Sequence, residues 1–174
     1  MTTLAFEKVE RLQSLYNNFG PPDEIKSLKA WLLAHPSETV AAIAKLKLYK
    51  FDVPIAEVIA NIGPPVANVC LPQLLGLVAD INWPVYAKAC EALTRFSWPL
   101  ILEALAQLVE QSEIEDVSRF CLWVRYTQPS LVGEVRQFLA AVIAQPGHHE
   151  IDLENAHEAL ADIDESLGTG TVNI

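Results

Sequence analysis

The stretch LPQLLGLVADINWPV, residues 71–85, decides the fold. Proline is tolerated in the first turn of a helix and damages a helix further along, so Pro72 and Pro84 each mark a helix start. The polar residues Asp80 and Asn82 lie between the two prolines and are typical of a turn. The stretch therefore predicts a helix, a turn and the beginning of a second helix.

The same organisation extends in both directions along the chain. Proline-bearing breaks separate segments whose apolar residues recur at steps of three and four, the spacing of one helix face. Three such stripes are Ile114, Val117, Cys121 and Val124; Leu131, Val135, Phe138 and Val142; and Leu153, Ala156, Leu160, Ile163 and Leu167. No segment shows the strict alternation of a half-buried strand. The sequence predicts an all-α fold of about nine or ten helices.

A weak internal repeat pairs these helices. A shift of 31 positions superposes Leu74, Leu77, Val78, Lys88 and Cys90 on Leu105, Leu108, Val109, Arg119 and Cys121. Helix pairs repeating every 20 to 50 residues are typical of solenoids, because one pair cannot bury its apolar face alone.

Residues 71–85, followed by Ala87, Ala89, Ala92 and Leu93, resemble a HEAT repeat, with Tyr86 at a position where HEAT repeats often carry arginine. The stretch is also similar to an uncharacterised bacterial family with an Asp-Ile-Asn-Trp-Pro motif. The resemblance implies a short HEAT-like α–α superhelix of antiparallel helices.

Length and composition indicate one folded domain. The chain has 174 residues, of which 51% are hydrophobic and 20% charged, and chains of this size usually build one core. We expect that domain over residues 1–167 and a flexible tail over 168–174. The first residues lack the pattern of a secretory signal, and no apolar run approaches the roughly 20 residues of a membrane span. Three cysteines in apolar segments favour buried free thiols, and together these features predict a cytoplasmic protein that does not bind membranes.

The charge is strongly acidic and unevenly distributed. Asp and Glu number 22 against 12 Lys and Arg, a formal charge of −10, which disfavours nucleic acid as a partner. Residues 1–50 carry +2 and the rest −12, and from Pro146 onward there are seven acids and no Lys or Arg. An acidic field steers basic partners. The candidate binding residues are Asp80, Asn82, Trp83, Glu113, Glu115, Asp116, Glu154, Glu158 and Asp162.

Catalytic signatures are few. The sequence contains no HExxH motif, no paired-cysteine zinc spacing, no serine nucleophile elbow and no phosphate-binding glycine loop, so we expect neither catalysis nor a cofactor. One cluster leaves an alternative open, a metal-dependent enzyme that uses His149, Glu150, His157 and Glu158. The other interpretation of that cluster is a solvated polar helix face. A relative of the helical-repeat DNA glycosylases is a third hypothesis, which the charge disfavours. The first hypothesis is a non-catalytic module that binds a basic protein, as an immunity protein, an antitoxin or an adaptor.

Overall fold

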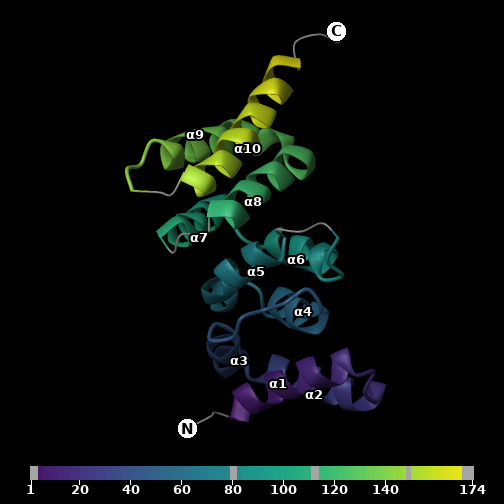
Figure 1. Ribbon diagram of the computed structural model, residues 1–174. Coiled ribbons are helices and arrows are strands. Elements are labelled where there is room, and N and C mark those ends of the chain that lie inside the picture. Colours follow the sequence, from purple (N-terminus) through teal and green to yellow (C-terminus); the bar gives the residue numbers. More distant parts are fainter. Residues whose placement is uncertain (1–3, 79–81, 111–113, 148–149, 170–174) are drawn as a thin grey trace. The chain divides into compact units, whose positions relative to one another are not determined.

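The protein is all-helical. A computed structural model describes residues 4–78, 82–110, 114–147 and 150–169, and these residues form ten α-helices, two short 3-10 helices and no strand (Figure 1). The predicted all-α class and number of helices are confirmed, while the HEAT-like superhelix of antiparallel helices stays a prediction. The chain divides into two compact units, Met1–Ile101 (unit 1) and Leu102–Ile174 (unit 2). The expectation of a single domain over 1–167 stays a prediction.

Unit 1 is built around α1 and α4. Its elements are α1 (Leu4–Asn17), α2 (Pro22–Ala34), α3 (Pro36–Ile43), α4 (Val53–Ile62), η1 (Val66–Cys70), α5 (Leu71–Leu77) and α6 (Tyr86–Leu93). Helix α1 packs against α2, α3 and α4, while α4 also packs against α6. The buried face of α1 consists of Ala5, Val9, Leu12 and Leu15, spaced at one turn of helix.

Unit 2 contains a three-helix group. After α7 (Trp98–Glu110), whose first turn contains the boundary between the units, come α8 (Ile114–Thr127), η2 (Pro129–Leu131), α9 (Val132–Ile143) and α10 (Glu150–Thr169). Helix α10 packs against both α8 and α9, which also contact each other (Figure 1). The first two residues of the expected tail, Gly168 and Thr169, lie at the end of α10.

Prolines lie at the start of half of the ten α-helices in the described residues, as the sequence predicts for such breaks. Helices α2, α3, α4, α5 and α7 each have proline at their first or second position. The Asn82-Trp83-Pro84 break differs, because α6 begins only at Tyr86. Its N-cap residue is Val85, whose backbone N–H donates to the carbonyl of Lys50 at 3.2 Å. The turn after residue 81 is therefore longer than the proline position alone predicts.

The predicted stripes supply part of the core of unit 2. Val117, Cys121 and Val124 of α8 are fully buried, as are Ala156 and Ile163 of α10, and Val135 and Val142 of α9 are buried. The other members whose side chains are described are half-buried or exposed: Leu131, Phe138, Leu153 and Leu160 are half-buried, and Leu167 is 47% exposed.

All three cysteines are free thiols, as predicted. Cys70 of unit 1 and Cys121 of unit 2 are fully buried, whereas Cys90 is half-buried. Burial raises the pKa of the Cys70 and Cys121 thiols to about 12. Both are therefore protonated and unreactive in the folded protein at neutral pH.

Helix α1 ends in a Schellman motif with an unusual residue in the left-handed position. Gly20 N–H donates to the Leu15 carbonyl at 2.7 Å and Phe19 N–H to the Tyr16 carbonyl at 3.4 Å. Phe19 has φ +53° and is 98% exposed. Glycine usually occupies this position because a side chain is strained there. Neither backbone geometry nor packing within the chain favours phenylalanine at residue 19.

We expect Phe19→Gly to stabilise the isolated protein by up to about 1 kcal/mol. The left-handed conformation costs a non-glycine residue about 1–2 kcal/mol, and the greater flexibility of glycine in the unfolded chain offsets part of the gain. Urea denaturation of the two proteins measures the difference. A loss of stability would show that the ring makes contacts that its exposure does not reveal.

No helix in the described ranges is long and apolar enough to cross a bilayer.

Candidate functional site

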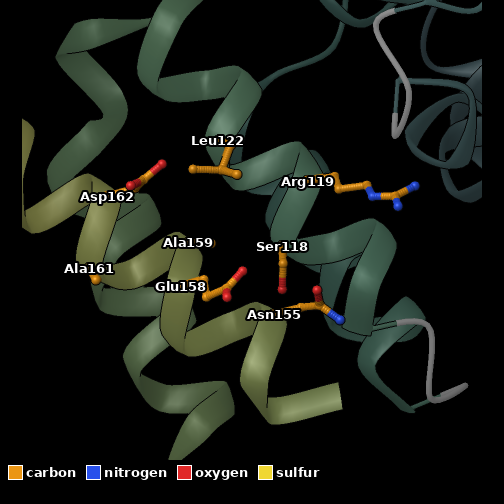
Figure 2. Close-up of a pocket in the computed structure, with 8 residues that line it drawn as sticks. All are labelled: Ser118, Arg119, Leu122, Asn155, Glu158, Ala159, Ala161 and Asp162. Atoms are coloured by element: carbon orange, nitrogen blue, oxygen red, sulfur yellow. The ribbon is translucent and has the colours of Figure 1, made fainter. Parts of the chain in front are cut away.

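A pocket lies between α8 and α10 of unit 2. Its volume is about 470 Å³, and Figure 2 shows the residues that line it. Helix α8 contributes Ser118, Arg119 and Leu122, and α10 contributes Asn155, Glu158, Ala159, Ala161 and Asp162. We call this the α8–α10 pocket.

Small side chains create the pocket. Ala159 is 1% exposed and Ser118 is 2% exposed, so both lie in the contact between the two helices. Alanine and serine leave room above the contact that larger side chains would fill. Leu122 adds an apolar surface on the α8 side. The lining of the pocket is therefore mixed, with the apolar surface of Leu122 beside polar and charged side chains.

Two carboxylates belong to the lining of the pocket. Glu158 and Asp162 are exposed and lie four residues apart, one turn along the same face of α10. Glu154 is exposed one turn before Glu158. The apolar surface of Leu122 with acidic side chains beside it suits an alkyl chain that ends in a positive charge.

Every arginine of unit 2 is paired with a carboxylate. Arg119 pairs with Glu115 along α8, Arg125 Nη1 lies 3.4 Å from Asp162 Oδ2, and Arg136 pairs with Asp164. The last two pairs connect α10 to α8 and to α9. Hydrogen bonding and the charge of Asp164 raise the pKa of Arg136 further above its ordinary value, so that pair is ionised at any physiological pH.

Unit 2 carries the entire net charge of −10, because unit 1 is neutral overall. Unit 2 has three arginines, no lysine and thirteen acids, whereas unit 1 has nine cationic and nine acidic residues. With its arginines already paired, unit 2 presents an excess of carboxylates to any approaching molecule. The C-terminal acidity seen in the sequence therefore coincides with one compact unit.

The structure brings together only some of the predicted binding residues. Glu158 and Asp162 line the pocket, Glu154 is beside it, and Glu115 pairs with Arg119. Asn82 and Trp83 belong to unit 1, in the turn before α6, where Asn82 is exposed and Trp83 half-buried. Asp80, Glu113 and the side chain of Asp116 lie outside the described residues.

The structure describes only part of the His/Glu cluster that the sequence suggests as a metal site. His157 and Glu158 are exposed on α10, while His149 and the side chain of Glu150 lie outside the described residues. Among the side chains that are described, no three His, Cys, Asp or Glu residues are grouped so that they could hold a metal ion.

Sequence reasoning missed the part of the pocket that comes from α8. Ser118 and Leu122 carry no charge pattern, and Asn155, Ala159 and Ala161 belong to no motif. The only available signal was the scarcity of cations after residue 101, which makes Arg119 and Arg125 conspicuous.

Comparison with protein-family models, with curated proteins and with solved structures returns no match for this chain.

Proposed function

We propose that this protein is a non-catalytic binding module whose unit 2 captures a basic protein partner. The observation that carries the proposal is the α8–α10 pocket, in which the apolar surface of Leu122 lies with the carboxylates of Glu158 and Asp162. A lysine or arginine of the partner would place its alkyl stem against Leu122 and its charge beside Glu158.

The wider charge of unit 2 supports the same assignment. A surface with an excess of carboxylates raises the association rate of a basic protein, and short-range contacts then determine the dissociation rate. Arg119 and Arg125, each held by a carboxylate of this chain, restrict the positions that a partner's own cations can occupy. Glu158, which forms no ion pair in the described residues, is the pocket carboxylate at which a positive group is favoured.

The broader biological role belongs to the same proposal. A small HEAT-like α–α superhelix in the bacterial cytoplasm, with an acidic binding surface, suits an immunity protein, an antitoxin or an adaptor. This assignment rests on the repeat-like sequence and on the general use of helical repeats as binding surfaces.

We expect charge reversal at Glu158 in the pocket and at Glu154 beside it to slow association with the partner by tenfold or more. The variant is Glu154→Lys/Glu158→Lys, because both residues are exposed and neither forms an ion pair among the described residues. Electrostatic steering changes association rates by about 10- to 1000-fold. The partner is captured from native lysate, identified, and then used purified, with its association rate measured at several salt concentrations.

The matched control is Glu103→Lys/Glu134→Lys, which makes the same change of charge in unit 2 away from the pocket. It should slow association clearly less than the pocket variant. Equal rates for the two variants would eliminate the pocket as the binding site. A captured partner that is acidic and insensitive to salt would overturn the proposed function.

A further inference from the structure

Unit 1 carries a turn that is rich in lysine and aromatic side chains. The turn between α3 and α4 reads KLKLYKF over residues 45–51, and we call it the basic turn. Lys45, Lys47 and Lys50 are exposed, and Tyr49 and Phe51 are 59% and 47% exposed. The ammonium of Lys50 lies 5.1 Å from the centroid of the Phe51 ring. Cations and rings are thus presented together to solvent.

Buried contacts hold the basic turn in one shape. Leu48 is buried, and the buried carboxylate of Asp52 accepts a hydrogen bond from Tyr49 N–H at 2.6 Å. Burial raises the pKa of Asp52, and the hydrogen bonds from Tyr49 and Gln13 partly oppose that shift. The Lys50 carbonyl accepts from Val85 N–H, which fixes the far side of the turn to the start of α6. A surface fixed in advance loses little entropy on binding.

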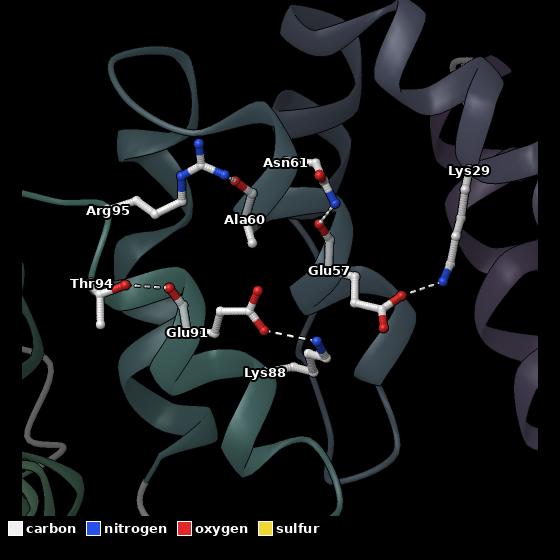
Figure 3. Close-up of polar contacts among 8 residues, drawn as sticks. All are labelled: Lys29, Glu57, Ala60, Asn61, Lys88, Glu91, Thr94 and Arg95. Atoms are coloured by element: carbon white, nitrogen blue, oxygen red, sulfur yellow. Dashed lines mark hydrogen bonds and ion pairs between the residues drawn. The ribbon is translucent and has the colours of Figure 1, made fainter.

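Most other cations of unit 1 are already engaged. Figure 3 shows Lys29 paired with Glu57, Lys88 with Glu91 at 2.7 Å, and Arg95 donating to the Ala60 carbonyl at 2.8 Å. Arg11 pairs with Glu24, and Lys8 lies over the Trp31 ring. In the described part of the chain, Lys8, Lys26 and the three lysines of the basic turn have neither a carboxylate nor a carbonyl as partner for their ammonium groups. The available positive charge is therefore concentrated on the turn.

The basic turn and the α8–α10 pocket are complementary in chemistry. The turn offers ammonium groups beside exposed rings, and the pocket offers carboxylates beside the apolar surface of Leu122. A pocket of about 470 Å³ has room for one lysine or tyrosine side chain. Its neighbour Glu154 can meet a second lysine of the turn.

We propose that the basic turn of one copy docks in the α8–α10 pocket of a second copy of this chain. The inference rests on the proposed function. The chain as a whole is acidic, and the basic surface that the pocket receives is the basic turn of a second copy. The two surfaces are different, so the contact is heterologous: each copy uses its turn toward one neighbour and its pocket toward another. Such a contact builds rings or open chains of subunits.

Two variants that each destroy one half of the contact test the proposal. The turn variant is Lys45→Glu/Lys47→Glu, and the pocket variant is Glu154→Gln/Glu158→Gln. None of these four side chains makes an ion pair in the described residues, so folding should be unaffected. Sedimentation equilibrium of the purified proteins measures their mass over about 1 μM to 1 mM, the range of weak association.

We expect the wild-type protein to form dimers and larger species. Each variant alone should have a dissociation constant for self-association at least about tenfold higher than that of the wild type. An equimolar mixture of the two variants should form a 1:1 dimer that grows no further. The mixture retains one intact turn, from the pocket variant, and one intact pocket, from the turn variant. Lys26→Glu and Glu103→Gln/Glu134→Gln, as controls, should assemble like the wild type.

Three results would overturn the proposal. They are a wild-type protein that stays monomeric throughout the range, variants that assemble alone, and a mixture that does not associate. If the copies stay monomeric while Glu154→Lys/Glu158→Lys still slows a partner from lysate, this inference fails and the proposed function stands.

Discussion

Phe120→Ala is expected to lower the free energy of unfolding by about 3–5 kcal/mol. Phe120 is fully buried in α8, and its ring centroid lies 5.1 Å from that of Trp123 in a tilted arrangement. Truncation removes the apolar area of the ring and also leaves a cavity, because close-packed neighbours relax only in part. The loss of the ring contact with Trp123 adds to the cost.

Phe19→Ala is the matched control for this measurement. It is the same chemical change at a ring that is 98% exposed, so the lost burial is close to zero. Chemical denaturation followed by circular dichroism gives both values, and tryptophan fluorescence reports the surroundings of Trp123. A loss below about 1 kcal/mol for Phe120→Ala would contradict the packing described for α8.

Gly20→Ala is expected to destabilise unit 1 by about 1–3 kcal/mol. A Cβ atom at residue 20 would lie 2.6 Å from Leu15 Cδ2, 2.9 Å from Leu15 Cβ and 3.1 Å from the Leu15 carbonyl oxygen. Leu15 is 6% exposed and belongs to the buried face of α1, so it cannot move aside without disturbing the core. The same carbonyl accepts the Gly20 N–H bond that closes the Schellman motif.

Gly133→Ala separates this steric effect from the general effect of replacing glycine. A Cβ at residue 133, in the first turn of α9, meets nothing within 4 Å. Alanine is the better helix former, so we expect no loss and a gain of at most about 1 kcal/mol. Thermal and urea denaturation compare the two variants. Equal behaviour at residues 20 and 133 would contradict the close approach of Gly20 to Leu15.

Helical periodicity was sufficient to predict the fold class and much of the core. Val117, Cys121 and Val124 are buried because their spacing places them on one face of α8, a local property that is visible in the sequence. Pro36 and Pro54 begin helices because the ring fixes φ and lacks an N–H that the first turn does not need.

Features that depend on contacts between distant segments could not be predicted. Arg125 and Asp162 are 37 positions apart, and their pairing depends on how α8 meets α10. The pocket likewise results from the small residues Ser118 and Ala159, which come together only after folding. Charge counting located Glu158 and Asp162, but it could not identify the surface that completes the site.

The two buried thiols give each compact unit its own chemical reporter. A thiolate is the species that reacts with disulfide reagents, and Cys70 and Cys121 remain protonated for as long as their surroundings are closed. Modification of either thiol must therefore wait until that part of the chain opens. One of these residues lies in each unit. The labelling rate of Cys70 therefore reports the opening of unit 1, and that of Cys121 the opening of unit 2, within a single intact protein.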